Sequence, residues 1–391
     1  MPITSAPGQA TPGCVPRQRD QSTEDVVLAP RFQSLVLQPT TLCNLNCSYC
    51  YLSASERKTR LEMSVPVAEA LAAGITERGT DVVDVVWHGG EPLTTRRDRF
   101  RALLEPFEPL RHQGRVRHFV QTNATLIDDA WCDLFHRYGF RVGVSIDGPE
   151  AANRARTDWG NRPSFDRVMR GISRLRAHDI AFSAICVVTE QTVTQPESLL
   201  EFFEDLGATS VGFNIEELEG ANDDRQTIPP ELVRRFWRKM FDRLDAGSPL
   251  RVREADRLLG YLADARAGGK DRWDTALHDP IPTVGTNGDV VVLSPELLGV
   301  KDDRYGDFVL GNVLGQTLAA ILNRIDEASY VREYTEGARR CRQECEFFVF
   351  CQGGQASNKY FEHGDFTVTE TAYCRNSKIE LARALGEKMG A

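Results

Sequence analysis

Long hydrophobic runs are absent from this sequence of 391 residues. No apolar stretch approaches the roughly 18 residues that a membrane-spanning helix needs, so we expect no membrane partner. The first residues, MPITSAPGQATPGC, also lack the apolar segment behind a basic one that marks a secretory signal. These absences predict a cytoplasmic protein, and a hydrophobic content of 41% is enough to bury a sizeable core.

An excess of positive charge is also missing. The 47 Lys and Arg residues are outnumbered by 56 Asp and Glu residues, which gives a formal net charge of −9. Because proteins that bind nucleic acids usually present a basic face, we expect no nucleic-acid partner. The seven histidines are scattered without the spacing of a metal site, and we assign none of them a catalytic role.

Apolar periodicity is missing from residues 1–28, which are rich in Pro, Gly, Ser and Gln, and we predict a mobile N-terminal tail there. From residue 29 to 220, apolar runs alternate with amphipathic segments. The runs predict strands at 34–39, 82–89, 116–123, 141–147, 180–189 and 209–217. The segments predict helices at 65–78, 97–112, 128–138, 164–178 and 196–206, the fourth with Ser164 as its N-cap. This order predicts an α/β fold, a partial (β/α)6 barrel whose ligands lie at the C-terminal ends of its strands.

The rest of the chain divides into two further segments. Residues 221–275 are mostly helical in pattern, and we predict a helical connector between the barrel and a C-terminal module at 276–391. An apolar stripe in the connector predicts a helix face that packs in the core: Phe236, Trp237, Met240, Phe241 and Leu244. The elements predicted for the module are a hairpin at 283–294 and helices at 316–333 and 378–389.

Ten cysteines could suggest a disulfide framework, but such frameworks are typical of short secreted chains. Seven of the ten instead fall into two groups with the spacing of metal ligands, which fits a reducing compartment better. The other three stand alone. We interpret Cys14 as a tail thiol, and Cys132 and Cys186 as packed core thiols.

The string CNLNCSYC places Cys43, Cys47 and Cys50 in one tight loop with the spacing C-x3-C-x2-C. Three thiolates can hold three corners of a [4Fe–4S] cube, whereas clusters that only carry electrons normally use four. The fourth iron is then open to a ligand that is not protein. With Tyr49 before the third cysteine, this loop resembles the cluster loop of the radical S-adenosylmethionine (SAM) superfamily. The alternatives are a fragment of a zinc site or unconnected thiols.

The resemblance implies that SAM binds the open iron and that an electron from the cluster cleaves it to a 5′-deoxyadenosyl radical. The string HGGEPL, after the second predicted strand, resembles the superfamily's GGE motif, which holds the amino group of SAM. QTNATL and SIDG, after the third and fourth strands, resemble its ribose contacts, although each alone also fits an ordinary turn. The residues implied to contact SAM are Tyr49, Gly89, Gly90, Glu91, Gln121, Asn123 and Ser145.

One arginine is a candidate for the carboxylate of SAM. Arg156 lies eight residues before Ser164, and in related enzymes an arginine at about this place pairs with that carboxylate. The planar guanidinium group suits a two-point contact of this kind. Arg154 is a close competitor, and an ordinary solvated loop arginine is the alternative.

The second cysteine group consists of CRQECEFFVFC and a further cysteine after a gap of 22 residues, namely Cys341, Cys345, Cys351 and Cys374. Four thiolates can close a [4Fe–4S] site with no open position, and tetrahedral zinc is the alternative. The pattern resembles the SPASM domain, which in full holds two auxiliary clusters. Because this chain has Gln355 where the first of these clusters needs a cysteine, and no cysteine beside the predicted hairpin, we expect one auxiliary [4Fe–4S] cluster in a SPASM/twitch-like module.

Longer strings narrow the resemblance. LVLQPTTLCNLNCSYCYL, VVWHGGEPL, QTNATLIDDAWCDLF, RVGVSIDGP, VGFNIEELEG and GGQASNKYFEHGDFTVTETAYCR resemble the GrrM/OscB group of radical SAM/SPASM peptide maturases. That resemblance implies a ribosomally made precursor peptide as substrate and a cyclophane as product, in which an aromatic ring carbon is joined to the β-carbon of a nearby residue. It also implies an external electron donor, flavodoxin-like or ferredoxin-like.

A general base would help the ring to lose its proton. The candidates on the correct rim of the barrel are Asp147, Glu216, Glu217 and Glu219, and the alternative is that they are loop carboxylates that contact peptide or solvent. Two other functions stay open. One is a thioether-forming (sactionine) or sulfatase-maturase-like radical enzyme, and the other is a cysteine-rich iron or zinc protein without catalytic activity.

Overall fold

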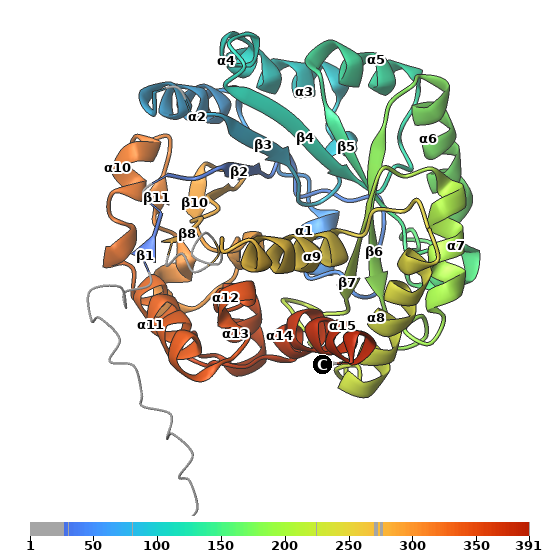
Figure 1. The fold of residues 1–391 in the computed structure, drawn as a ribbon. Coiled ribbons are helices and arrows are strands. Elements are labelled where there is room, and N and C mark those ends of the chain that lie inside the picture. The colour runs from blue at the N-terminus through green and yellow to red at the C-terminus, as the bar shows by residue number, and fades with distance from the viewer. Residues whose placement is uncertain are drawn as a thin grey trace, which may run out of the picture.

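The computed structural model describes residues 27–390 apart from Pro30, Thr80, Asp224, 270–272 and 274–276. The tail predicted at 1–28 therefore lies almost wholly outside the described residues, as does Cys14. The main sheet of the described part has the strand order β11-β10-β9-β2-β3-β4-β5-β6-β7 (Figure 1). Its strands are β2 Ser34–Leu37, β3 Val83–Trp87, β4 Val116–Thr122, β5 Arg141–Ser145, β6 Phe182–Val188, β7 Val211–Ile215, β9 Thr283–Val284, β10 Asp289–Val291 and β11 Gly311–Asn312. A small separate sheet pairs β1 Val27–Leu28 with β8 Leu277–His278.

The strands from β2 to β7 form the predicted barrel. Each pairs in parallel with the next, which confirms the α/β fold and all six predicted strands. The helices that connect them cover the outer side of the curved sheet (Figure 1). They are α2 Val65–Glu77, α3 Arg97–Leu104, α4 Glu108–His112, α5 Asp129–Tyr138, α6 Phe165–Ala177 and α7 Pro196–Leu206. Because all six strands are parallel, the loops that follow them meet at one edge of the sheet.

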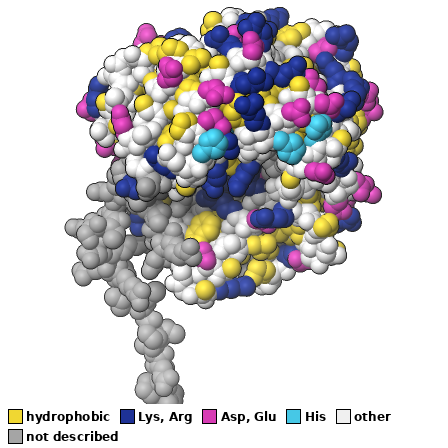
Figure 2. Space-filling model, turned by 90° about the horizontal axis from the view of Figure 1, so that it is seen from above, with side chains coloured by type: hydrophobic (Ala, Val, Ile, Leu, Met, Phe, Trp, Pro, Cys, Tyr) yellow, Lys and Arg dark blue, Asp and Glu magenta, His cyan; other side chains and the backbone are white. Residues whose placement is uncertain are grey.

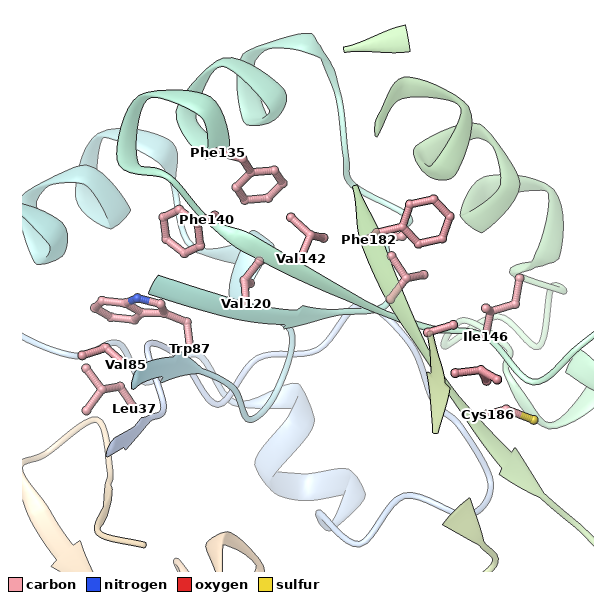
Figure 3. Packing of buried hydrophobic residues seen from close by; sticks show 14 of the residues in the cluster. Leu37, Val85, Trp87, Val120, Phe135, Phe140, Val142, Ile146, Phe182 and Cys186 are labelled. Carbon is pink, nitrogen blue, oxygen red and sulfur yellow. The ribbon is translucent and has the colours of Figure 1, made fainter. Parts of the chain in front are cut away.

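A core of buried side chains lies between the sheet and these helices (Figure 3). Trp87 on β3 packs on Phe100 of α3 with ring centroids 5.1 Å apart, and its indole nitrogen donates to Nδ1 of His118 at 3.2 Å. Burial lowers the pKa of His118 to about 4, so this histidine is a neutral core residue. Cys132 and Cys186 are fully buried in the same core, as predicted.

One local prediction in the barrel was wrong, and another was confirmed only in position. The helix predicted at 97–112 is interrupted by a 3-10 turn between α3 and α4, because Pro106 and Pro109 lack the N–H groups that a continuous helix needs. Ser164 does stand at the N-cap position of α6, but its side chain makes no capping bond. Its hydroxyl instead donates to the carbonyl oxygen of Arg156 at 2.7 Å, which ties the loop of that arginine to the helix.

The connector and the C-terminal segment continue the same fold. The connector holds α8 Pro230–Asp245 and α9 Arg253–Arg266, and the predicted apolar stripe on α8 faces the core. The predicted hairpin is formed by β9 and β10, and β9 pairs in parallel with β2. The C-terminal segment thus extends the barrel sheet at its first strand. The remaining helices are α10 Leu318–Leu322, α11 Ser329–Glu344, α12 Phe348–Cys351, α13 Ala356–His363, α14 Ala372–Cys374 and α15 Glu380–Met389.

The single helix predicted at 316–333 was wrong. The chain turns between α10 and α11 because the two helices pack into different cores. Ile321 of α10 belongs to the barrel core, whereas Tyr330 of α11 belongs to a separate cluster with Phe308 and Phe366. As a result α11 runs on to Glu344 and carries Cys341 on its last turns.

Two further properties of the described residues are the hydropathy of the helices and the distribution of charged side chains on the surface. Among them, no helix combines the length and the apolar character that crossing a membrane requires. On the face drawn in Figure 2, the coloured basic and acidic side chains lie next to one another, interspersed with apolar ones.

Candidate active site

A cavity of ≈ 340 Å³ lies at the C-terminal ends of the barrel strands. It brings together residues from the cysteine loop, from HGGEPL, from the ends of β4, β5 and β7, and from the C-terminal segment. The predicted site residues that line it are Cys43, Cys47, Tyr49, Cys50, Gly89, Gly90, Glu91, Gln121, Asn123, Ser145, Arg156, Glu216, Glu217 and Glu219. Asp147 is not part of the lining but contacts three residues that are, namely Tyr49, Arg156 and Val187.

A short helix that the sequence did not predict supports the cysteine loop. This helix, α1 Ala54–Lys58, starts with a capping box. The buried guanidinium of Arg57 donates from α1 to the carbonyl oxygens of Leu45 and Leu52 at 3.2 and 3.0 Å. The carbonyl oxygen of Arg57 accepts from the N–H of Cys43 at 2.9 Å. These three bonds hold the loop at both ends, so the three thiols face the cavity together.

The environment of the three thiols favours their neutral form in the protein alone. Burial raises the pKa of Cys43 to about 12, and burial also raises the pKa of Cys47 and of Cys50. The positive charge of Arg156 acts in the opposite direction on the pKa of Cys47. A bound metal would displace the protons and hold the sulfurs as thiolates.

The HGGEPL loop lies directly against the cysteine loop. Gly89 and Gly90 have φ values of +89° and +59°, a region that favours glycine. A Cβ on Gly90 would stand 2.7 Å from the carbonyl oxygen of Thr40 and 2.8 Å from those of its two successors. The backbones of the two loops are in contact only because this side chain is missing.

The Glu91 carboxylate is buried and already bonded. It accepts from the hydroxyl of Thr122 at 2.7 Å and from the backbone N–H groups of Asn123 at 2.7 Å and Leu93 at 3.0 Å. Burial raises its pKa against the effect of these donors. Since a carboxylate has about four acceptor positions, one is left for a ligand. Because Thr122 and Asn123 lie at the end of β4, their bonds to Glu91 also join the loop after β3 to the end of β4.

The polar residues at the ends of β4 and β5 form two hydrogen-bonded pairs. The Gln121 side-chain amide donates to the hydroxyl of Ser145 at 2.8 Å. The Asn123 amide donates to the side chain of Asn44 in the cysteine loop at 2.9 Å. Of the ribose candidates, Asn123 is thus held to the cysteine loop by a direct hydrogen bond.

Arg156 belongs to a buried chain of three polar groups. Its guanidinium donates to the hydroxyl of Tyr49 at 2.7 Å, and that hydroxyl donates to the carboxylate of Asp147 at 2.6 Å. Asp147 also accepts from the backbone N–H of Val187 at 3.1 Å. Arg156 is 5% exposed, whereas its competitor Arg154 is exposed to solvent. The Nε of Arg156 has no hydrogen-bond partner among the described residues.

The three glutamates after β7 have different environments. Glu216 is held by the guanidinium of Arg225 at 2.6 Å, and the same arginine donates to Ser48 of the cysteine loop at 2.8 Å. Glu217 and Glu219 both accept from the side-chain amide of Asn358, each at 2.9 Å. Glu217 and Glu219 therefore lie side by side, bridged by one amide from α13.

Burial dominates the acidity of this pair. It raises the pKa of Glu217 to about 7, and it raises the pKa of Glu219 well above its usual range, with the charge of Glu217 adding to the effect. Glu217 and Glu219 both line the cavity. At neutral pH the two carboxyls together can hold a proton and exchange it with a bound molecule.

Several lining residues were not singled out from the sequence. Glu296 and Gln355 line the cavity from the C-terminal segment. Tyr51 and His88 also line it, with the Tyr51 hydroxyl 3.5 Å from Nε2 of His88. Burial lowers the pKa of His88, so its ring is neutral. The position of Tyr51 directly after CNLNCSYC was an available signal, whereas nothing in the local pattern marks Glu296.

The second cysteine group is spread over three helices. Cys341 lies on α11 with Cys345 at its C-terminal end, Cys351 ends α12, and Cys374 ends α14. Burial raises the pKa of Cys374 to about 12 and that of Cys341 to about 11. Within the described ranges, no set of three or more His, Cys, Asp or Glu side chains is arranged to hold a metal ion as the side chains stand.

Comparison with known sequences gives consistent results. The sequence model described as the Radical SAM superfamily matches residues 37–218. An uncharacterized protein of Synechocystis is 34% identical over 375 residues, which cover 91% of this chain and 92% of that protein. A serine-type anaerobic sulfatase-maturating enzyme of Bacteroides thetaiotaomicron is 25% identical over 351 residues, 83% of this chain and 82% of the enzyme.

Two solved structures share the fold. Native anSMEcpe with bound AdoMet superposes with a TM-score of 0.71 at 21% identity, over 91% of this chain and 98% of that one. SuiB of Streptococcus suis bound to the precursor peptide SuiA gives a TM-score of 0.64 at 18% identity, over 89% and 76%. The two structures show that the chain shares their fold, and the sequence matches show that it belongs to the radical SAM superfamily.

Proposed function

We propose that this radical SAM enzyme modifies a ribosomally made precursor peptide by joining an aromatic ring carbon to the β-carbon of a nearby residue, which forms a cyclophane. The observation that carries the proposal is one cavity to which the barrel and the C-terminal segment both contribute side chains. A peptide side chain in it would lie beside the cysteine loop and beside paired carboxylates. The names of two similar proteins, a sulfatase-maturating enzyme and a SuiB bound to its precursor peptide, support a peptide or protein substrate.

Three parts of the chain would share this work. They are a barrel at 29–220, a helical connector at 221–275 and a SPASM/twitch-like module at 276–391. The pairing of β9 with β2 supports this division, because it docks the module on the barrel edge next to the cysteine loop. Asn358 then reaches across from the module to the glutamates of the barrel.

The barrel side of the cavity fits a [4Fe–4S] cluster with SAM. Three cysteine thiols can bind three irons of a [4Fe–4S] cluster and leave the fourth iron free to bind SAM. The unpartnered Nε of buried Arg156 suits an anionic ligand, since a buried donor without a partner is costly. When bound, the pair supplies the 5′-deoxyadenosyl radical that removes a hydrogen atom from the peptide. We assign the cluster to Cys43, Cys47 and Cys50, and SAM to Arg156 and to the polar residues of the cavity named above.

Two of the carboxylates act as positioning groups, and the other two form a pair that is the candidate base. Glu216 is engaged by Arg225, and Asp147 by Tyr49, so both act on the shape of the site. Glu217 and Glu219 line the cavity with raised pKa values, and we assign them the proton that the ring loses when aromaticity returns. The low polarity that raises their pKa also makes the ionised pair a stronger base than a solvated glutamate.

The second cysteine group would hold one auxiliary [4Fe–4S] cluster. Its four thiols match the donor set of a closed cluster, and the chain offers no further cysteine within the module for a second one. When bound, such a cluster supplies an acceptor for the electron that the ring must lose. A flavodoxin-like or ferredoxin-like protein would deliver the electrons that begin each turnover.

The test is a reaction of the anaerobically reconstituted enzyme with SAM, dithionite and the precursor peptide encoded beside its gene. We expect 5′-deoxyadenosine and a peptide lighter by two hydrogen atoms, with no fragment ions between the joined residues. A variant in which Cys43, Cys47 and Cys50 are all alanine is the control and should give neither product. A peptide of unchanged mass in a reaction that does cleave SAM would refute this substrate assignment.

A thioether-forming or sulfatase-maturase-like activity is the second candidate, favoured by the sequence similarity to sulfatase-maturating enzymes. Mass alone does not separate it, because oxidation of serine and thioether formation also remove two hydrogen atoms. A formylglycine product would react with a hydrazide, and a thioether would leave one cysteine of the peptide resistant to alkylation. A cyclophane does neither.

A further inference from the structure

A lysine is buried among the cysteines of the second group. Lys359 lies on α13 and is 1% exposed, yet its Nζ has no hydrogen-bond partner among the described residues. The ammonium group lies 5.5 Å from the centre of the Tyr334 ring. A buried ammonium is costly unless an anion balances it, so its surroundings need an explanation.

The acidic groups around Lys359 are mainly thiols, which become negative when they bind a metal. Cys341, Cys374 and Cys351 lie nearest to it in electrostatic terms, and Asp365 follows. The carboxylate of Asp365 is bonded to the backbone N–H and hydroxyl of Thr367, and it keeps its charge. Asp365 thus balances part of the ammonium charge, and a cluster held by the cysteines would supply further negative charge.

A missing side chain lets both the lysine and a backbone segment lie against α11. A Cβ on Gly337 of α11 would stand 2.2 Å from the carbonyl oxygen of Phe366 and 2.8 Å from the lysine Nζ. Gly337 precedes Cys341 by one helical turn, so the two residues share a face of α11. The ammonium group therefore lies against the face of α11 that carries the first cysteine of the group.

The charge of the expected cluster fits this arrangement. A [4Fe–4S] cube with four thiolates carries two negative charges when oxidised and three when reduced. A fixed positive charge stabilises the reduced state more than the oxidised state, because the attraction grows with the charge. Net charge and the surroundings of the sulfurs are what set the potential of such clusters.

We propose that Lys359 is a positioning residue for the auxiliary cluster that raises its reduction potential, so that the cluster can accept one electron from the modified peptide. The inference rests on the proposed function, since it needs that cluster to be present. In this reaction the ring radical would lose one electron, which the oxidised cluster would accept, and one proton, which the carboxylates would accept. The oxidised form of the external carrier would then take the electron from the cluster.

The experiment isolates the auxiliary cluster. In a parent protein with Cys43, Cys47 and Cys50 all changed to alanine, only the second group can bind iron, and we expect about four irons per chain. The cluster is then titrated electrochemically and followed by electron paramagnetic resonance. The variants are Lys359→Met, Lys359→Gln and Lys359→Arg. The control is Lys301→Met, which removes the same charge from a lysine that is 81% exposed.

We expect the two neutral variants to lower the ratio of reduced to oxidised cluster at fixed potential by about tenfold or more, equivalent to about 59 mV for one electron. Lys359→Arg and Lys301→Met should stay near the parent value. An unchanged potential in the neutral variants, with full iron content, would overturn the role of Lys359.

Iron content separates the remaining outcomes. A parent protein without iron would refute the auxiliary cluster, and with it part of the proposed function. Loss of iron in both neutral variants but not in Lys359→Arg would support the need for a positive charge. Loss of iron in all three variants would overturn the proposal, because packing rather than charge would then be the cause.

Discussion

Replacing Glu217 by glutamine should raise the stability of this protein and lower the yield of its proposed reaction. Burial raises the pKa of this carboxyl from its ordinary value of 4.5 to about 7 in the folded chain. Glutamine keeps an oxygen that can accept from Asn358, as the glutamate does at 2.9 Å, but it never ionises. The substitution thus removes a buried charge without removing the hydrogen bond.

The sign of the effect on stability follows from the proton balance. Between pH 4.5 and about 7, the folded protein keeps a proton on Glu217 that the unfolded chain releases, so stability falls as pH rises through this range. At about 1.4 kcal/mol for each pKa unit, the loss reaches about 3 kcal/mol above pH 7. Glu217→Gln should therefore be more stable than the parent by up to about 3 kcal/mol at about pH 8 and by little at about pH 5.

The assay is anaerobic thermal unfolding of the reconstituted protein at both pH values, where this difference amounts to a rise in Tm of a few degrees. Glu190→Gln, at an exposed position, is the control and should show no such pH dependence. The stabilised variant should also form less crosslinked peptide while still cleaving SAM. An equal effect of Glu217→Gln on Tm at both pH values would refute the reasoning, because the carboxyl would then have its ordinary pKa.

Three further substitutions test other parts of the site. Arg156→Lys should weaken SAM binding about tenfold or more in a titration of the reconstituted enzyme, because lysine lacks the planar fork and cannot reproduce the contact with Tyr49 at 2.7 Å. Gly90→Ala should lower cluster incorporation, measured as iron and sulfide per chain, because the new Cβ would meet three carbonyl oxygens of the cysteine loop at 2.7 to 2.8 Å. Cys374→Ala should reduce iron from about eight to about four per chain while 5′-deoxyadenosine is still released.

Each of these has a matched control in the chain. Arg154→Lys changes an exposed arginine of the same loop and should leave SAM binding unchanged. Gly79→Ala imposes a similar backbone strain, about 1–2 kcal/mol, at φ +85° but meets no atom within 4 Å, so iron content should stay at the parent level. Cys132→Ala removes a buried core thiol and should cost stability but no iron. A control that behaves like its partner would contradict the corresponding assignment.

The barrel was predictable because its signals are local. A strand such as Val83–Trp87 is a short apolar run between polar turns, and its neighbours in the sheet follow in chain order. Asp128 caps α5 through the N–H of Trp131, as an aspartate at that helix start predicts. Since parallel strands in chain order place their C-terminal ends together, the gathering of the barrel motifs around one cavity also followed from the sequence.

The parts that escaped prediction depend on long-range contacts. Glu217 and Asn358 are 141 positions apart, and the sequence around either residue gives no indication that the two are in contact. The break between α10 and α11 arises because Ile321 and Tyr330 belong to different cores, which a local apolar period does not reveal. Arg57 was missed for a third reason: α1 is only five residues long, too short for a periodic pattern.

These long-range contacts explain why a barrel motif alone does not fix the reaction. The cysteine loop is held by Arg57 of α1 and by Arg225 of the connector, and the HGGEPL loop packs against the backbone that leads into it. The bridge from Asn358 brings the C-terminal segment against the carboxylates, and Glu296 and Gln355 also line the cavity. For the proposed function, we expect specificity for the bond that is formed to depend on these contacts between the barrel and the C-terminal segment, which the sequence patterns of the two parts do not indicate.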